Sequence, residues 1–416
     1  MNTTARQPLR LLCAFACAVL AGALACGNGG RADLLIEDVW VIDATGRDPY
    51  RASICIDDGR IRDIARPDEH SCAGASEVIP GEGGYLIPGL WDMHVHLAED
   101  EARPGALDTL LAHGVTTVRD MGGRFDVLER WRRESLAGER AGPDLILVGP
   151  TINGPGDDSY HLEAVTRAEG AAAVDSVATL GVDQVKVHRL LPRDAFLGVL
   201  EAAGRHELLI VGHVPHGVSA LEACELGMAE IAHLSALLEA AVMRADEPAA
   251  GIAGALSDLT GQRGSRTYEC IAARSGAITP NLVAYVHAGR IADPELAELT
   301  RRLVDRLGDV VMQMSAAGVV LMTASDAPGE HNEIPWGVSV PEEMELLVSA
   351  GLAPLQAISA ATADPARFTE RYDDVGTIEI GKQADLLLLR ANPLEDIAAT
   401  RDMRWIVSNG RLIRPR

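Results

Sequence analysis

Short stretches in which apolar and polar residues alternate open and close the chain. Residues 33–86 contain "DLLIEDVWVIDATG", "ASICIDDGRIRDIA" and "SEVIPGEGGYLIPG", and the same texture returns near the C-terminus in "VGTIEIGKQADLLLL" and "WIVSNGRLIRPR". A period of two is typical of β-strands with one buried face. The pattern therefore predicts a small β-sandwich domain built from both chain ends, residues 32–86 plus 373–416.

Residues 87–372 follow a different rhythm, in which strand-like runs are separated by helical stretches. The eight runs end near His96, Asp120, Pro150, His188, His213, His233, Leu282 and Asp326. Eight such units in this length are typical of a (β/α)8 TIM barrel, an α/β fold. The span 235–276 is longer than one helix requires, and we interpret it as an insertion.

Composition and charge narrow the class of protein. The chain has 416 residues and is 47% hydrophobic, which is enough for a large globular core. Its net charge of -23 argues against nucleic acid or an anionic membrane as a partner. The charge does not identify a substrate, because most of the carboxylates are expected on the solvated surface.

The first 26 residues have the pattern of an export leader. A basic start with Arg6 and Arg10 precedes the apolar run "LLCAFACAVLAGALA", which ends before Cys26. "ALAC" resembles a bacterial lipoprotein cleavage box with lipid on Cys26; plain cleavage near Ala25 and an uncleaved anchor are the alternatives. All three predict an exported protein, either periplasmic or anchored to the outer membrane of a bacterium.

Four cysteines lie beyond this leader, widely spaced and without a CxxC pair, so a zinc-finger type of site is not expected. Cys55 and Cys72 are candidates for a disulfide in an oxidising compartment, and buried free thiols are the alternative.

Candidate chemistry begins with "PGLWDMHVHLAED", in which His94 and His96 close the first strand-like run. Residues two apart on a strand share a face, so both imidazoles point the same way. Neutral imidazole nitrogen binds divalent metals well, although two histidines on a polar strand face would be an ordinary alternative.

Further residues of the same kind close later runs. In "DQVKVH" the valines face the helices, so Lys186 points into the barrel, where a buried ammonium is costly unless it is paired or chemically changed. His213, His233 and Asp326 end three more runs. Each residue has a structural alternative, but strand ends meet at one rim of a barrel, so the sequence predicts that they converge.

On these motifs the chain resembles the amidohydrolase superfamily, in particular its imidazolonepropionase and prolidase-like hydrolases. The resemblance rests on "YLIPGLWDMHVH", "QVKVH", "GHVPHG", "IAHLS", "TASDAPG" and the closing "GTIEIGKQADLLLLRANPLEDI". It implies two divalent metal ions, with zinc expected, bridged by a carboxylated Lys186. The implied metal ligands are His94, His96, Lys186, His213, His233 and Asp326.

The function implied is hydrolysis of an amide, peptide or cyclic-amide C–N bond in a small molecule such as a dipeptide or an N-acyl amino acid. A metal-bridged hydroxide would attack, with Asp326 as general base and then acid. His216 is a candidate for stabilising the oxyanion or holding a substrate carboxylate. Weaker candidates for substrate contact lie on predicted rim loops: Tyr160, His161, Asn281, Tyr285, His331 and Trp336.

Three alternatives stay open. A lactonase or phosphotriesterase would use the same metal core. A deaminase on the same barrel would use one metal and carry a glutamate three residues after the strand-five histidine, where this chain has His216. A non-catalytic surface binding protein is the third, although such a protein would be expected to lose ligands. The sequence does not indicate the oligomeric state, so a homo-oligomer stays open.

Overall fold

A computed structural model describes residues 32–66, 69, 72, 74–99, 102–156, 161–243, 249–329, 331 and 333–415. The predicted leader, with Cys26, lies outside these ranges, and so does Tyr160. No helix within the described ranges combines the length and the apolar character needed to span a bilayer.

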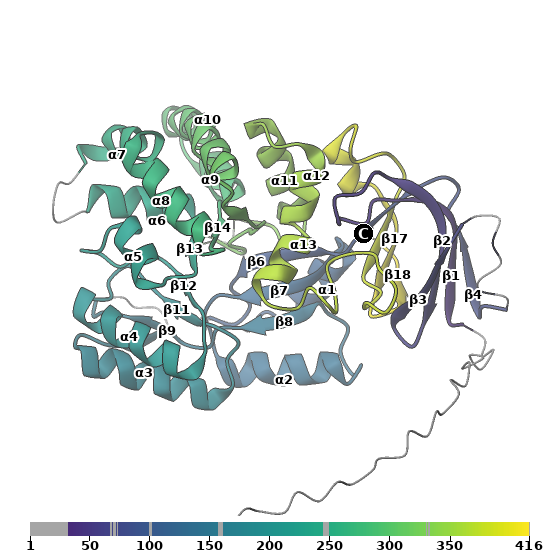
Figure 1. Cartoon of the computed structure of the whole chain (residues 1–416), viewed down its shortest axis with the longest axis horizontal. Coiled ribbons are helices and arrows are strands. Elements are labelled where there is room, and N and C mark those ends of the chain that lie inside the picture. The colour runs from purple at the N-terminus through teal and green to yellow at the C-terminus, as the bar shows by residue number, and fades with distance from the viewer. Residues whose placement is uncertain are drawn as a thin grey trace, which may run out of the picture.

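Strands from both chain ends form one mixed sheet in the order β18-β17-β16-β5-β1-β2-β3, with β4 also paired to β1. It lies at the right of Figure 1, with purple N-terminal strands beside yellow C-terminal ones. The strands are β1 (Leu34–Val41), β2 (Tyr50–Asp57), β3 (Arg60–Ala65), β4 (Glu77–Pro80), β5 (Tyr85–Pro88), β16 (Leu386–Leu389), β17 (Met403–Ser408) and β18 (Arg411–Ile413).

This arrangement agrees with a β unit drawn from both ends, but the eight strands belong to one sheet. This pairing does not show the sandwich that we predicted. Alternation along a strand indicates that one face is buried but not what covers it. The boundaries at 86/87 and 372/373 remain predictions. In β1 a register shift lies between Ile36 and Val39, and it brings both side chains to the buried side.

The middle of the chain contains three parallel sheets, ordered β6-β7-β8, β10-β9-β11-β12 and β13-β14-β15. Their strands are β6 (Leu90–Val95), β7 (Val115–Asp120), β8 (Asp144–Leu147), β9 (Thr151–Asn153), β10 (His161–Glu163), β11 (Val185–Val187), β12 (Ile210–Gly212), β13 (Glu230–Ala232), β14 (Ala277–Thr279) and β15 (Val320–Leu321).

Helices alternate with these strands and cover them. They are α1 (Pro104–Ala112), α2 (Phe125–Leu136), α3 (Arg167–Leu180), α4 (Arg193–His206), α5 (Ala220–Leu226), α6 (Leu234–Val242), α7 (Gly251–Thr260), α8 (Gln262–Ala273), α9 (Leu282–Ile291), α10 (Pro294–Ala317), α11 (Ser339–Ala350), α12 (Pro354–Ala360) and α13 (Ala363–Phe368), with a 3-10 turn, η1, at Ile397–Arg401.

Local signals fix the helix ends. Thr166 and Glu169 form a capping box at the start of α3, and Gly181 ends that helix in the left-handed conformation. At α10, the side chain of Asp293 accepts hydrogen bonds from the backbone N–H groups of Glu295 and Leu296. The segment 235–276, interpreted as an insertion, contains most of α6 and all of α7 and α8.

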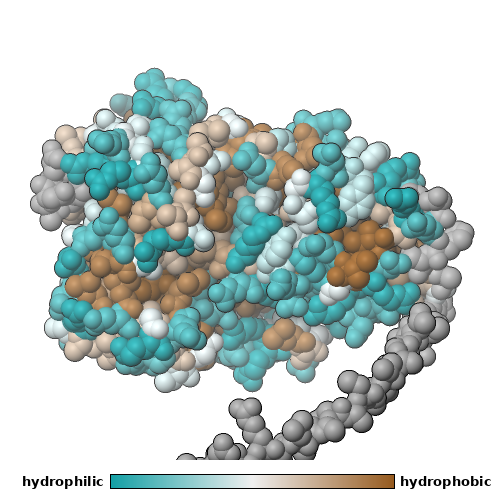
Figure 2. Space-filling view, in the orientation of Figure 1, coloured by the Kyte–Doolittle hydropathy of each residue, from teal (hydrophilic) through white to brown (hydrophobic). Residues whose placement is uncertain are grey.

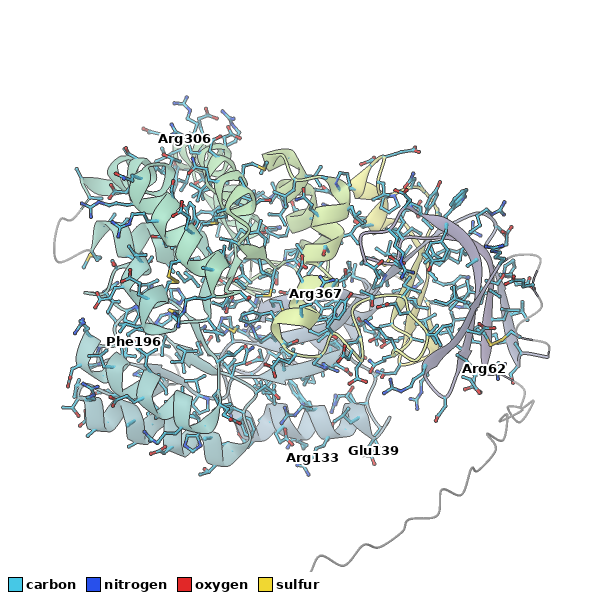
Figure 3. All side chains as sticks on the ribbon, viewed as in Figure 1. Arg62, Arg133, Glu139, Phe196, Arg306 and Arg367 are labelled. Atoms are coloured by element: carbon cyan, nitrogen blue, oxygen red, sulfur yellow. A yellow bond between two sulfur atoms is a disulfide. The ribbon has the colours of Figure 1, made fainter. Side chains whose placement is uncertain are left out.

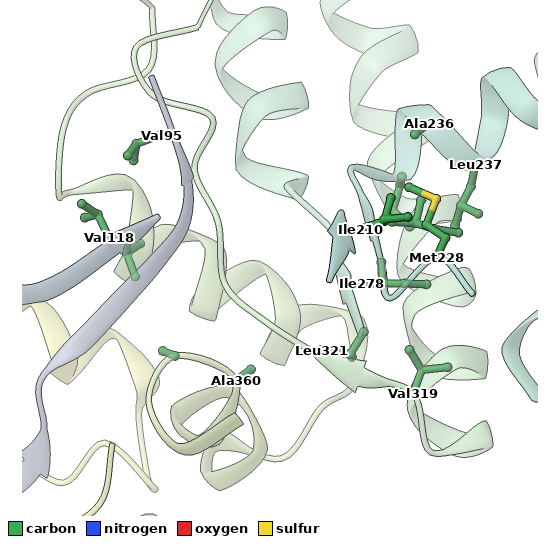
Figure 4. Packing of buried hydrophobic residues seen from close by; sticks show 14 of the residues in the cluster. Val95, Val118, Ile210, Met228, Ala236, Leu237, Ile278, Val319, Leu321 and Ala360 are labelled. Atoms are coloured by element: carbon green, nitrogen blue, oxygen red, sulfur yellow. The ribbon is translucent and has the colours of Figure 1, made fainter. Parts of the chain in front are cut away.

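Apolar side chains from strands and helices meet in one large core. In Figure 4, Ile210 of β12 lies near Leu237 of α6, and Leu321 of β15 lies near Val319; all four belong to this core. Arg306, labelled at the top of Figure 3, is one of the charged side chains on the solvent-exposed surface. Figure 2 shows hydrophilic side chains over much of the visible face.

Two disulfides link separate segments of the chain. Cys55 of β2 is bonded to Cys72, so this candidate pair is linked in the structure. Cys224 of α5 is bonded to Cys270 of α8, a pairing that the sequence did not indicate because 46 residues separate the two positions. This second bond ties the inserted helices to the strand-flanking helix α5.

A buried charged network lies beneath the candidate rim. Arg119 donates to the Met93 carbonyl (2.9 Å), to Gln184 Oε1 (2.9 Å) and to Glu230 Oε1 (2.8 Å). Thr279 Oγ1 also donates to Glu230 Oε1, and neither Arg119 nor Glu230 has an exposed side chain. The network ties β6, β7, β13 and β14 together from the inside.

We expect Arg119→Met to lower the free energy of unfolding by about 3–5 kcal/mol, because it leaves the Glu230 carboxylate buried without its cation. Urea unfolding of the metal-free protein measures this. The control is Arg301→Met, whose ion pair with Glu298 is solvent-exposed and should contribute little to the free energy of unfolding. Equal losses in the two variants would contradict a structural role for the buried pair.

Candidate metal centre

Three side chains converge where β6 ends. His94 lies in β6, His96 follows it, and Asp326 comes from the loop after β15. Asp326 Oδ1 is 3.3 Å from the Nε2 atom of each histidine, and the two Nε2 atoms are 3.2 Å apart. Three lone-pair donors this close together fit a shared cation, and these are donor types that bind zinc.

The other three predicted ligands line the same cavity, which has a volume of about 1320 Å³. Lys186 is in the middle of β11 and only 3% exposed, while His213 and His233 directly follow β12 and β13. The His233 ring lies between two others, with centroids 4.3 Å from His94 and 5.1 Å from His213. All six side chains therefore reach one cavity, although their roles remain predictions.

Burial controls the charge of these groups. It lowers the pKa values of His94 and His213 well below the ordinary range and that of His233 to about 4. The Nδ1 atom of His213 is buried without a hydrogen-bond partner in the described part of the chain. Neutral imidazoles with available lone pairs are the form that binds metal, so the donor set fits the implied ions.

His96 and Asp326 behave as an ion pair. Burial alone would lower the pKa of His96, but its interactions with the accepting carboxylates of Asp326 and Glu99 outweigh burial and raise the pKa to about 10. Burial raises the pKa of Asp326, yet the neighbouring His233 and His96 bring it down to about 2. The cluster thus retains a carboxylate and attracts a positive charge, which a metal ion would supply.

Asp92 links the strand that carries His94 to the loop that carries Asp326. Its Oδ1 accepts from the backbone N–H groups of Ser325 (2.9 Å) and His94 (3.2 Å), and its Oδ2 accepts from Ser325 Oγ (2.6 Å). The N–H of Asp326 donates to the His94 carbonyl at 2.8 Å. Burial raises the pKa of Asp92 to about 7, against these hydrogen bonds.

The eighth strand is shorter than the sequence suggested. β15 ends at Leu321, and the residues up to Asp326 are irregular. The N–H groups of Met322, Thr323 and Asp326 donate in turn to the carbonyls of Ile278, Ala360 and His94. The backbone after β15 therefore hydrogen-bonds to three different segments in turn. Asp326 reaches the site from this loop, and its own φ is 66°.

The candidate substrate contacts separate into two groups. Asn281, Tyr285 and His331 line the cavity. His216 does not line it; its Nε2 is 4.0 Å from Glu239 Oε2. His161 and Trp336 are likewise absent from the cavity lining, and Tyr160 lies outside the described residues. The predicted role of His216 at the reacting group is therefore not supported by its position.

Several cavity residues were not found from the sequence: Glu99, Arg103, His188, Arg189 and Glu239. Glu99 Oε2 lies 2.9 Å from His96 Nδ1. The His188 ring meets that of His213 edge-on, with centroids 4.2 Å apart. His188 and Arg189 follow β11 directly, so their place at a strand end was the available signal.

Comparison with known proteins identifies the family of this chain. A model of the amidohydrolase family matches residues 85–411. The chain belongs to the amidohydrolase family. Structures with related folds include a Xaa-Pro dipeptidase with bound methionine in the active site (TM-score 0.72, 22% identity, 92% of this chain and 99% of the other) and bottromycin amidohydrolase (TM-score 0.73, 23% identity, 92% and 87%). At these identities the likeness shows the fold alone.

Family members with recognisable sequence similarity include adenine deaminases. That of Deinococcus radiodurans is 25% identical over 376 residues, 86% of this chain and 59% of the deaminase. That of Staphylothermus marinus is 32% identical over 197 residues, 44% of this chain and 33% of the deaminase. The chain thus matches less than two thirds of the length of these relatives.

The buried imidazoles predict a pH dependence of stability for the metal-free protein. In the unfolded chain they take up protons near pH 6.5, whereas burial keeps His94, His213 and His233 neutral in the fold. At these three positions the folded state binds fewer protons, so their contribution to the free energy of unfolding falls as pH drops from 6.5 toward 4, by about 1.4 kcal/mol per pH unit for each histidine. The raised pKa of Asp92 contributes with the opposite sign, so the histidine share is read from the difference between a variant and the wild type.

Urea unfolding between pH 7 and pH 5 measures this slope. His233→Asn should remove the contribution of one histidine from the dependence of the free energy of unfolding on pH. The control is His206→Asn, which changes a partly exposed histidine on α4 that is paired with Asp175. An unchanged slope in His233→Asn would show that His233 is already protonated in the fold.

Proposed function

We propose that the protein is a metal-dependent hydrolase that cleaves a C–N bond of a small molecule, an amide, peptide or cyclic amide. The observation that carries the proposal is the convergence of His94, His96 and Asp326 in a cavity that also holds buried Lys186. Family membership supports the same class of reaction. A dipeptide or an N-acyl amino acid is the substrate class that we favour.

We further propose that the three parallel sheets are parts of one (β/α)8 barrel. β8 ends at Leu147 and β9 begins at Thr151, so both can belong to one interrupted strand. The Ala229 N–H donates to the Ile210 carbonyl between β12 and the start of β13. Val95 pairs with Ala327 beyond β15, which supports closure between the first and last strands.

Two divalent ions, proposed to be zinc, would be held by His94, His96, His213, His233 and Asp326, with a carboxylated Lys186 shared between them. When bound, such ions polarise a carbonyl and lower the pKa of water. Burial lowers the pKa of Lys186 and so favours its neutral amine, which is the form that adds to carbon dioxide. The resulting carbamate would carry negative charge toward the metals.

The identity of residue 186 also supports this chemistry. The chain contains only two lysines, Lys186 and Lys382, against many arginines. Lys382 has ordinary partners, since its Nζ donates to the Tyr372 carbonyl (2.5 Å) and Thr377 Oγ1 (2.5 Å) and lies 2.8 Å from Glu379. An arginine would serve for charge alone, whereas a carbamate requires an amine.

The residues have separate tasks in the proposed reaction. Asp326 has a pKa of about 2, so it is ionised at neutral pH and can accept a proton from water. Its side chain is 30% exposed, which lets it face a substrate in the cavity. The same carboxyl group would then return the proton to the leaving nitrogen. Asn281 and Tyr285 are the proposed substrate contacts on the α9 side.

Deamination is the second candidate function. It is favoured by the adenine deaminase of Rhizobium etli, which is 26% identical over 409 residues, 95% of this chain and 59% of the deaminase. Against it stand Lys186, which suits a two-metal site, and the absence of a glutamate at position 216. Release of ammonia from adenine by the zinc-loaded protein would decide for deamination.

We also propose that the protein is exported to the periplasm or to the outer membrane. The predicted leader and the two disulfides support this, because disulfides persist in oxidising compartments. Lipid on Cys26 and plain leader cleavage are distinguished by mass spectrometry of the protein isolated from its native membrane fraction.

The carbamate can be tested directly because there are only two lysines. We expect ¹³C-bicarbonate to give one carbamate resonance in the zinc-loaded protein, and Lys186→Ala to remove it together with about half of the bound metal and most of the activity. Lys382→Met is the matched control, a buried lysine in the sheet region, and it should keep the resonance and the metal. Two-metal occupancy in Lys186→Ala would contradict the bridging role.

A further inference from the structure

Arg189 is a cation in the cavity lining that has no anionic partner among the described residues. It lines the metal-centre cavity, and within the described ranges its side chain forms no hydrogen bond or ion pair. Arg193, four residues later, shows the usual arrangement: its guanidinium is exposed and donates to Glu222 Oε1 at 2.8 Å. In a chain with 60 acidic residues against 37 basic ones, an unpaired arginine at a cavity is unusual.

The backbone around Arg189 is fixed from both sides. Its carbonyl accepts a hydrogen bond from the His216 N–H at 2.7 Å, and the next N–H, that of Leu190, donates to Asn153 Oδ1 at 3.0 Å. Asn153 is fully buried. A Cβ on Gly154 would come within 2.0 Å of the Leu190 carbonyl oxygen, so a side chain there would displace the turn.

This turn also places Arg189 next to the metal centre. The preceding residue, His188, contacts His213 edge-on at 4.2 Å between centroids, and its Nδ1 lies 3.2 Å from Asn153 Nδ2. Burial lowers the pKa of His213 most. The charges of the neighbouring histidines, of Lys186 and then of Arg189 lower this pKa further. An anion bound to Arg189 would therefore sit on the His213 side of the reacting groups.

We infer that Arg189 is a specificity-determining residue that binds an oxyanion of the substrate, a carboxylate or a phosphate monoester, close to the scissile bond. A guanidinium presents a planar fork of N–H donors that matches such oxygens, and a fixed backbone reduces the entropy lost on binding. Neutral purines offer no such group. The inference rests on the proposed hydrolase function and names its substrate class.

Matched ligand pairs test this. One arm compares dipeptides and N-acetyl amino acids with the same compounds in which the carboxylate is a carboxamide. The other arm compares N-acetylglucosamine 6-phosphate with N-acetylglucosamine. Turnover gives KM and kcat for compounds that are hydrolysed, and calorimetry with the zinc-loaded protein gives Kd for those that are not.

We expect the wild-type protein to prefer the anionic member of one arm by about 10-fold or more, the usual scale for a charge-assisted hydrogen bond. Arg189→Met should bring that ratio close to one, mainly through KM or Kd, and leave kcat and the neutral member nearly unchanged. Arg189→Lys should restore part of the preference. Arg193→Met, the matched control, should behave as wild type.

The outcomes separate the two hypotheses. If the anion-to-neutral ratio is the same in Arg189→Met and wild type for both arms, or if both members weaken equally, Arg189 does not bind the anion and the inference is wrong. If anions bind through Arg189 but the wild-type protein hydrolyses no C–N bond in either arm, the inference stands and the proposed hydrolase function fails. If Arg189→Met removes the preference for the anionic member in one arm alone, that arm identifies the anion as a carboxylate or as a phosphate monoester.

Discussion

The buried carboxylate of Asp92 connects the first strand of the α/β region to the loop that carries Asp326. It accepts hydrogen bonds from the backbone N–H and the hydroxyl of Ser325, which lies 233 residues away in the sequence. It also accepts one from the backbone N–H of His94. A buried carboxylate is costly without such partners, so these bonds hold it in one geometry. The spacing of His94, His96 and Asp326 depends on this attachment.

Burial then sets the chemistry of the cavity. It keeps three imidazoles neutral and lowers the pKa of Lys186, while the neighbouring cations keep Asp326 ionised. Arg119 and Glu230 form a further ion pair, and both of its side chains are fully buried. The result is a cavity whose lone pairs favour cations, with the guanidinium of Arg189, proposed to bind an anion, in the lining of the same cavity.

The sequence predicted the parts of the site that follow from strand periodicity. His94 and His96 share a direction, and Lys186 points inward between two outward valines, because side chains alternate along a strand. Periodicity says nothing about loops, so it could not place His216, whose Nε2 lies 4.0 Å from Glu239 Oε2 at the edge of the cavity lining and whose role stays a prediction. Likewise, alternation in the terminal strands showed a buried face but not that one sheet holds all eight.

The sequence by itself determined which residues close each strand, the inward direction of Lys186 and the family to which those motifs belong, since these depend on local backbone geometry and residue chemistry. Only the tertiary structure decided the disulfide between Cys224 and Cys270, the fixed turn at Arg189 and the approach of Asp326 through a loop beyond a short β15. Each of these depends on backbone hydrogen bonds or packing between distant segments, which no local pattern encodes.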